Sequence, residues 1–166
     1  MRPNPDELDY RLKMVEVIER SNLLEVQSGI VCHQVNCIGV MGAGLALQLR
    51  NKWPVVFDRY KDECRHFVTH PEAMLGHVQD VMVGDNLIVA NCFAQVFPDR
   101  DGVMTDYNAW NVILDKLADL SNYFSLDLHF PWMIGCGLAG GDWNVILGKI
   151  KSQFGHGSTQ AFIHRL

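Results

Sequence analysis

The chain has 166 residues, which is the size of one domain able to bury most of its apolar surface. Its composition is that of an ordinary globular protein, with 48% hydrophobic and 20% charged residues. The formal charge of −5 argues against a broad electrostatic contact with a nucleic-acid backbone. Any polyanionic ligand therefore has to be held by local donors.

The start of the sequence, MRPNPDELDYRL, has acidic residues where a signal peptide has an apolar core. The most apolar long window, residues 29–49, is interrupted by polar side chains and glycines, which argues against a membrane span. We expect a cytoplasmic monomer in which residues 1–13 form an N-terminal arm and residues 14–166 form one domain.

The five cysteines have no paired spacing, which indicates reduced thiols and a cytosolic compartment. Cys64, His66 and His70 lie close together, but the sequence offers no fourth ligand for zinc. We expect neither a metal site nor a cofactor.

The first half of the chain predicts two strands and then two helices. Residues 14–19 (MVEVIE) alternate apolar and polar, as in a strand with one solvated face. Residues 29–36 (GIVCHQVN) are mostly apolar and predict a central strand. A helix is expected from about residue 44 to residue 53, because Pro54 cannot continue it. Residues 54–65 predict another helix, with proline in its first turn.

Two further strands and a helix are expected next. Residues 78–83 and 87–93 predict strands separated by a Gly-Asp-Asn turn. Thr105 or Asp106 can cap the following helix, in which apolar side chains recur at helical spacing.

The last part of the chain continues the alternation. Residues 125–131 predict a strand, Asp142 can cap a helix, and residues 160–166 close the chain as a short strand. Strands that alternate with helices predict an α/β fold with a mixed central sheet between helical layers.

Two glycine-rich junctions follow predicted strands: NCIGVMGAG (residues 36–44) and MIGCGLAGGDW (residues 133–143). Ligands of open α/β sheets bind at the carboxyl edge, where such junctions lie. Glycine lets the backbone approach a ligand closely, and a helix start adds free N–H groups with a partial positive charge. Together the junctions could hold a diphosphate through backbone amides, although each alone also fits a tight turn.

Other nucleotide-binding and hydrolase motifs do not match. The sequence contains no P-loop motif and no G-x-G-x-x-G with an acidic partner about 20 residues on. No serine lies in a nucleophile elbow.

Four separate blocks, in order, resemble the macrodomain family. They are ERSNLLEVQSG (19–29), HQVNCIGVMGAGLA (33–46), TDYNAWNVILDKL (105–117) and IGCGLAGGDW (134–143). The resemblance runs from about residue 14 to the C-terminus and implies the three-layer macrodomain fold. It is nearest to the branch with the terminal ADP-ribose glycohydrolase, the yeast ADP-ribose 1''-phosphate phosphatase and the antitoxin that removes ADP-ribose from DNA. Compact bacteriophage members are similar, which would place the protein in the host cytoplasm.

The resemblance implies that ADP-ribose or a derivative is the ligand. Asn36 would hydrogen-bond the distal ribose, and Asn22 replaces the usual Asp near adenine with an uncharged acceptor. The ligand-binding residues that it implies are Asn22, Leu23, Asn36, Met41, Gly42, Ala43, Gly44, Ile134, Gly135, Cys136, Gly137, Leu138 and Ala139.

Catalytic residues are less clearly implied. The glycohydrolase branch uses a Lys after the fourth strand and an Asp just after the phosphate loop, whereas this chain has no Lys in ANCFAQVFPD (90–99) and has Ala139 at the second place. Asp142 is either a helix N-cap or a candidate acid.

His33 is the other catalytic candidate. The phosphatase relative has a His at the matching place, three residues before its ribose-binding Asn. A neutral His could act as base or acid near neutral pH, or could be a buried structural residue. An ideal strand would place His33 and Asn36 on opposite faces, unless the chain bends there. Cys37 and Cys136 lie inside the two loops, and we expect them to be packing residues rather than nucleophiles.

Two classes of function remain open from the sequence. One is a hydrolase that acts on ADP-ribose 1''-phosphate or removes ADP-ribose from a macromolecule. The other is a non-catalytic module that sequesters ADP-ribose or a related NAD-derived ligand. Nucleic acid is expected only as an ADP-ribosylated substrate, given the acidic charge.

Overall fold

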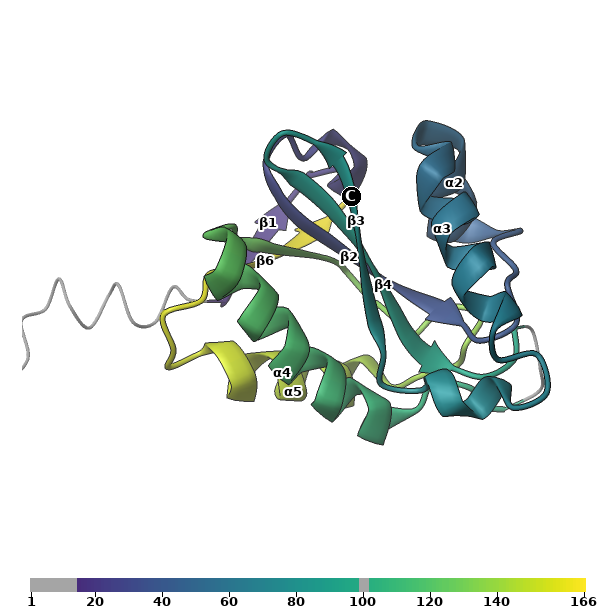
Figure 1. The fold of residues 1–166 in the computed structure, drawn as a ribbon. Helices are drawn as coiled ribbons and strands as arrows, with labels where there is room; N and C mark the ends of the chain where they lie inside the picture. Colours follow the sequence, from purple (N-terminus) through teal and green to yellow (C-terminus); the bar gives the residue numbers. More distant parts are fainter. Residues whose placement is uncertain (1–14, 99–101) are drawn as a thin grey trace, which may run out of the picture.

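The computed structural model describes residues 15–98 and 102–166, and the predicted arm lies outside them. The described residues form a six-stranded sheet with the order β1-β6-β5-β2-β4-β3 (Figure 1). The strands are β1 (Val15–Glu19), β2 (Gly29–Asn36), β3 (Val78–Gly84), β4 (Leu87–Gln95), β5 (Leu128–Pro131) and β6 (Ala161–Arg165). Only the β3–β4 pair is antiparallel, so the sheet is mixed. The other strands all end at one edge.

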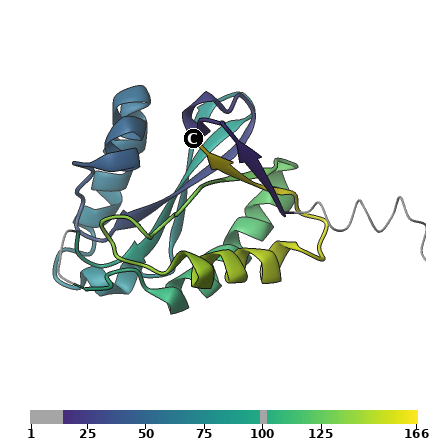
Figure 2. The same cartoon turned by 180° about the vertical axis from the view of Figure 1, so that it is seen from behind.

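Helices cover both faces of the sheet (Figures 1 and 2). They are α2 (Gly44–Lys52) and α3 (Pro54–Arg65) on one face, and α4 (Tyr107–Phe124) and α5 (Trp143–Phe154) on the other. Two short 3-10 turns, η1 (Leu23–Glu25) and η2 (Pro71–Met74), were not predicted from the sequence. The three-layer α/β arrangement is confirmed.

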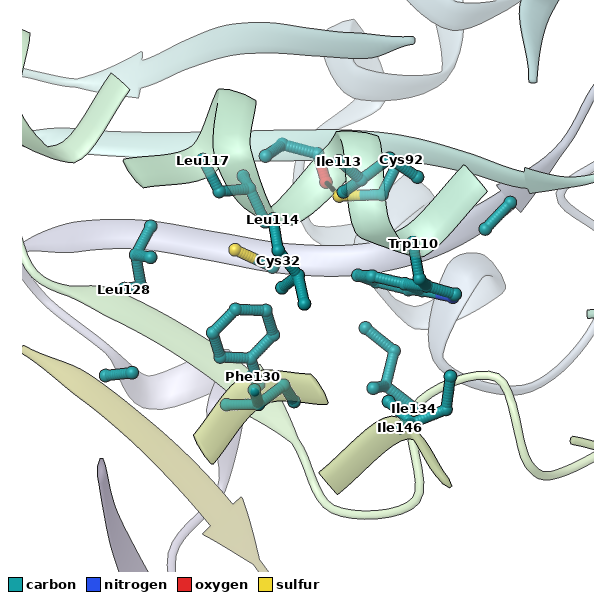
Figure 3. Packing of buried hydrophobic residues seen from close by; sticks show 14 of the residues in the cluster. Cys32, Cys92, Trp110, Ile113, Leu114, Leu117, Leu128, Phe130, Ile134 and Ile146 are labelled. Atoms are coloured by element: carbon teal, nitrogen blue, oxygen red, sulfur yellow. Dashed lines mark hydrogen bonds between the residues drawn. The ribbon is translucent and has the colours of Figure 1, made fainter. Parts of the chain in front are cut away.

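Alternation along β2 and β4 divides the core into two layers. Ile30 and Cys32 pack toward α4 and α5, whereas Val31 and Val35 pack toward α2 and α3. Figure 3 shows the first layer, in which Trp110 and other α4 side chains lie over strand residues. Nearly every residue of both strands is buried, which explains their continuous apolar sequences.

The ends of most elements lie within a few residues of the predicted positions. Asp106, not Thr105, caps α4, since its carboxylate accepts from the Ala109 N–H at 2.8 Å. β5 begins at Leu128 rather than Ser125, because Ser125 is the left-handed residue that ends α4. No helix in the described ranges has the length and apolarity needed to cross a bilayer.

Candidate functional site

A cavity of about 630 Å³ lies where β2, β4 and β5 end. Its lining residues are 33–36, 40–46, 95, 98, 131–135 and 137–139. Both predicted glycine-rich junctions therefore contribute to one cavity at the carboxyl edge. A hollow of similar size between α4 and α5, about 640 Å³, is lined by helical side chains such as Asn111 and Lys149, which bond to each other. None of its lining residues belongs to either junction.

The side chain of Asn36 organises the first loop. Its Oδ1 accepts from the N–H groups of Ile38 and Val40 at 3.1 and 3.3 Å, and its Nδ2 donates to the Val40 carbonyl at 2.7 Å. The buried Tyr60 hydroxyl lies 2.6 Å from the same Oδ1 and accepts from the Gly39 N–H at 3.1 Å. Asn36 is 6% exposed. Its amide is mainly engaged in hydrogen bonds within the loop, and one of its N–H hydrogens remains for a ligand.

The next three residues of this loop line the cavity and have unpaired N–H groups within the described structure. Within the described residues, no acceptor lies within hydrogen-bond reach of the N–H groups of Met41, Gly42 or Ala43. Ala43 is the N-cap of α2 and provides no side-chain cap, and the first turn of α2 also lines the cavity. By contrast, α4 and α5 on the opposite face of the sheet each begin with an aspartate cap. The positive end of α2 therefore remains available to an anion.

The second loop also contains consecutive unpaired N–H groups within the described residues. The N–H groups of Gly137, Leu138 and Ala139 have no acceptor among residues 15–98 and 102–166, while the flanking Cys136 and Gly140 N–H groups bond within the loop. Three successive N–H groups in a glycine-rich turn form a concave donor surface of the kind that binds phosphate. All three residues line the cavity.

Backbone and hydroxyl contacts hold this second loop in place. The Ala139 carbonyl accepts from the Met104 and Thr105 N–H groups at 2.7 and 3.2 Å, and the Thr105 hydroxyl donates to the Gly135 carbonyl at 2.5 Å. Gly135 has φ +73°, and a Cβ there would lie 2.6 Å from the Gln34 Oε1. Only glycine fits at this position without a shift.

A chain of side-chain hydrogen bonds joins α4 to the cavity wall. The Trp110 indole donates to the Gln34 Oε1 at 2.8 Å, and the Gln34 Nε2 donates to the Gln95 Oε1 at 2.8 Å and to the Thr105 hydroxyl at 3.0 Å. The Gln95 Nε2 donates to the Phe97 carbonyl at 3.0 Å. Gln34 and Gln95 both line the cavity, and neither was among the residues predicted for the site.

His33 lies in the cavity wall but is only 1% exposed. Its Nε2 lies 2.5 Å from the Asn91 Oδ1, and Asn91 in turn donates to the Gln79 Oε1 at 3.0 Å. The His33 Nδ1 is buried without a partner in the described structure. Burial lowers the pKa of His33 to about 4, against a smaller opposite effect of Asn91. His33 is therefore neutral at physiological pH and cannot act there as a general acid.

His33 and Asn36 lie on the same face of the sheet. His33 contacts Asn91 beneath α3, and Asn36 contacts Tyr60 of α3. Asn36 is the last residue of β2, and its side chain bonds to Ile38 and Val40 of the following loop, so the alternation of the strand no longer sets its direction. The register shift beside it leaves Ala94 of β4 as the extra residue.

Four predicted residues do not line the cavity. The Asn22 Oδ1 caps η1 by accepting from the Leu24 N–H at 3.0 Å, and Leu23 is buried beside it. The Asp142 carboxylate caps α5 and accepts from the Asn144 N–H at 2.9 Å, which supports the capping interpretation over the catalytic one. Cys136 turns its thiol toward the Ile134 carbonyl.

The two loop thiols lack the properties of nucleophiles. Burial raises the pKa of Cys37 to about 12 and that of Cys136 to about 11, with a smaller effect of Asp142 on Cys136. Both thiols are protonated at neutral pH. Phe93 is fully buried against Tyr60 and His77, so it is a core residue.

Two further lining residues follow β5, and only Met133 belongs to a predicted junction. Trp132 packs its ring 5.1 Å from the Trp143 ring, and the guanidinium of Arg165 lies 4.5 Å from its centroid. Met133 has φ +65° and is 42% exposed. An aromatic residue directly after Pro131 was the signal that could have drawn attention to this wall.

The described cavity wall has no Asp, Glu, Lys or Arg. Negative charge on a ligand would be balanced there by backbone N–H groups and the α2 dipole rather than by cationic side chains. This agrees with the donor type expected from the sequence.

No protein-family profile matches the sequence. A stretch of 44 residues is 39% identical to a DNA ADP-ribosyl glycohydrolase of Mycobacterium tuberculosis, and it spans 26% of this chain and 12% of that protein.

Solved structures are similar over most of the chain. A protein of unknown function from Bacteroides thetaiotaomicron is 29% identical with a TM-score of 0.80, over 92% of this chain and 98% of that one. The macrodomain of Mycobacterium tuberculosis DarG is 22% identical with a TM-score of 0.75, over 92% and 97%. Thermosipho africanus DarTG, solved in complex with ADP-ribose, is 15% identical with a TM-score of 0.72, over 91% of this chain and 42% of that one. The chain has the macrodomain fold.

Proposed function

We propose that the protein binds ADP-ribose or an ADP-ribose derivative in the cavity at the carboxyl edge. The observation that carries the proposal is a pair of loops that line one cavity and have unpaired N–H groups within the described residues, at positions 41–43 and 137–139. A diphosphate has enough oxygen atoms to accept from both. Its charge would be balanced by these donors and by the uncapped start of α2.

The ribose end of the ligand would lie over the first loop. Asn36 shapes that loop through its bonds to Ile38 and Val40 and retains one N–H for a ribose hydroxyl. The role proposed for Asn36 is therefore partly indirect. Gly42 and Gly44 leave the backbone open to close contact, since a Cβ at Gly44 would meet no atom within 4 Å.

Recognition of adenine is the least constrained part of the proposal. Asn22 lies after β1 at the same sheet edge, outside the cavity lining. Its Oδ1 already accepts from Leu24, and an amide oxygen can accept a second hydrogen bond. An uncharged acceptor that is shared in this way would favour adenine weakly.

The fold of the DarTG structure solved with ADP-ribose supports this ligand class, because the chain matches it with a TM-score of 0.72. A functional inference from fold alone would be an analogy. The loops of this chain add the specific donors that such a ligand needs.

Hydrolysis of an ADP-ribosyl bond is a second candidate function. The 39% identity over 44 residues with a DNA ADP-ribosyl glycohydrolase favours it. Water would attack the anomeric carbon of the bound ribose, or the terminal phosphate if ADP-ribose 1''-phosphate is the substrate. In the described wall the only titratable side chain is His33, which is neutral at physiological pH and could act only as a base. The geometry therefore favours binding over turnover.

One incubation series distinguishes the two functions. The protein is mixed with ADP-ribosylated DNA, ADP-ribosylated protein and ADP-ribose 1''-phosphate, and the products are separated by mass. Release of ADP-ribose from one of these, lost in Gly137→Val, would establish a hydrolase. No product from any substrate, together with measurable binding of ADP-ribose, is the result expected of a binding module.

A further inference from the structure

The hydrogen bonds that connect Trp110, Gln34 and Gln95 have only one possible direction. An indole N–H can only donate, so the Gln34 oxygen must face Trp110. The Gln34 amide nitrogen then faces Gln95 and Thr105, and its two hydrogens are both used. The amide orientation of Gln34 is thus determined by a side chain that cannot accept.

The same reasoning orients Gln95. Its Oε1 must face the Gln34 nitrogen, which leaves its own nitrogen as the donor on the other side. One hydrogen of that nitrogen goes to the Phe97 carbonyl, which can only accept. Each donor in this series of hydrogen bonds therefore faces an acceptor, from the Trp110 indole at one end to the Phe97 carbonyl at the other.

One N–H hydrogen of Gln95 remains without an acceptor within the described residues. Gln95 is half-buried, lines the cavity and is the register partner of Asn36 across β2 and β4. A half-buried donor on a cavity wall that is oriented by its neighbours, but not fully paired, is arranged to meet an acceptor on a ligand.

We propose that Gln95 is a specificity-determining residue whose remaining N–H donates to an oxygen acceptor on the terminal-ribose side of the ligand. The proposal rests on the proposed function, in which Asn36 and its loop lie beneath the terminal ribose. A neutral amide at this position recognises the sugar without attacking it or transferring a proton. Trp110 and Gln34 act as positioning residues, because they determine which end of the Gln95 amide faces the cavity.

The test compares two ligands that share adenosine and diphosphate. ADP-ribose carries the terminal ribose and ADP does not. Affinities of both are measured by calorimetry for the wild-type protein, for Gln95→Met, which keeps the length and removes the donors, and for Gln95→Glu, which replaces the amide with a carboxylate. The thermal midpoint of each variant is measured to check folding.

We expect the wild-type protein to prefer ADP-ribose over ADP, and Gln95→Met to lose about tenfold in ADP-ribose affinity with little change for ADP. Gln95→Glu should lose more, because a carboxylate can only accept and repels phosphate. Unchanged preference in Gln95→Met would overturn the assignment, as would equal affinity of the wild-type protein for the two ligands. Failure of the wild-type protein to bind either ligand would instead overturn the proposed function together with this inference.

A measurement on the wild-type protein covers the case in which the variants do not fold. The side-chain amide signals of Gln95 in a ¹H–¹⁵N spectrum are assigned through residue-selective labelling and sequential assignment. ADP-ribose should shift the free hydrogen of this amide, whereas ADP should not. Equal shifts with both ligands, or none with either, would contradict the contact with the terminal ribose.

Discussion

The hydroxyl of Tyr60 lies 2.6 Å from the Oδ1 of Asn36 and 2.8 Å from its carbonyl oxygen, so a fully buried residue of α3 supports the loop that begins the site. The two residues are 24 positions apart, and the same hydroxyl accepts from the Gly39 N–H. The loop conformation thus depends on packing between β2 and α3 as well as on the loop sequence.

Tyr60→Phe should therefore weaken ligand binding although Tyr60 does not line the cavity. The substitution removes the hydroxyl that joins Asn36 and Gly39, and the loss should cost about 1–2 kcal/mol of stability. We expect affinity for ADP-ribose to fall by about threefold to tenfold as the loop loosens. Urea unfolding and calorimetry measure the two effects. Tyr123→Phe is the matched control, since Tyr123 is 82% exposed and its variant should match the wild-type protein in both.

Asn36→Ala should have a larger effect on binding, about 1–3 kcal/mol, because it removes the loop bonds and the remaining N–H donor together. Since Tyr60 and Asn36 act through the same loop, the double variant should lose less than the sum of the two single losses. Calorimetry on the four proteins gives the coupling. Strictly additive losses would show that Asn36 acts on the ligand independently of the loop.

The two central glycines of the second loop should behave differently when substituted. Gly135→Ala places a Cβ at φ +73° and 2.6 Å from the Gln34 Oε1, so it should lower the free energy of unfolding by about 1–3 kcal/mol. A Cβ at Gly137 meets no atom within 4 Å, so Gly137→Val should fold normally and fill part of the cavity. Thermal unfolding should separate the first variant from the wild-type protein, and ligand titration should separate the second. Equal free energies of unfolding for the wild-type protein, Gly135→Ala and Gly137→Val would contradict the difference expected between the two glycines.

Acid should destabilise the protein as the pH falls from about 6.5 to about 4. The folded protein holds the pKa of His33 at about 4, so the unfolded chain binds more protons in this range and stability falls with pH. The stability lost to His33 by pH 4 is of order 3 kcal/mol. Burial also lowers the pKa of His129 to about 4, with a smaller effect of the adjacent His164. Urea unfolding at pH 7, 5.5 and 4 measures the slope.

His33→Gln should reduce that slope, and His66→Gln serves as the control because His66 is exposed on the surface. An unchanged slope in His33→Gln would show that the folded protein takes up a proton at His33 more readily than its burial implies. If the protein proves to be a hydrolase that uses His33 as a base, the acidic limb of its kcat/KM profile should lie near pH 4 rather than near 6.5.

The elements of the fold could be predicted from the sequence because their signals are local. Pro54 separates α2 from α3, Asp106 and Asp142 cap α4 and α5, and the apolar run 29–36 is the central strand β2. The two glycine-rich junctions were also predictable as parts of the site, since strand–loop–helix order places them at one sheet edge.

The polar residues of the site were harder to predict because their roles depend on distant partners. Gln34 and Gln95 look like ordinary strand residues, and only the indole of Trp110, 76 residues from Gln34, determines how their amides are oriented. His33 and Asn36 share a face because Asn36 lies where β2 ends and bonds into the following loop, and strand periodicity does not predict where alternation stops.

Titration calorimetry with ADP-ribose tests the account most directly. We expect the wild-type protein to bind one equivalent with a dissociation constant in the micromolar range, about −7 to −9 kcal/mol, and Gly137→Val to lose most of this affinity while it keeps its thermal midpoint. Absence of heat and of any thermal shift at millimolar ADP-ribose would contradict the proposed site, whatever the fold.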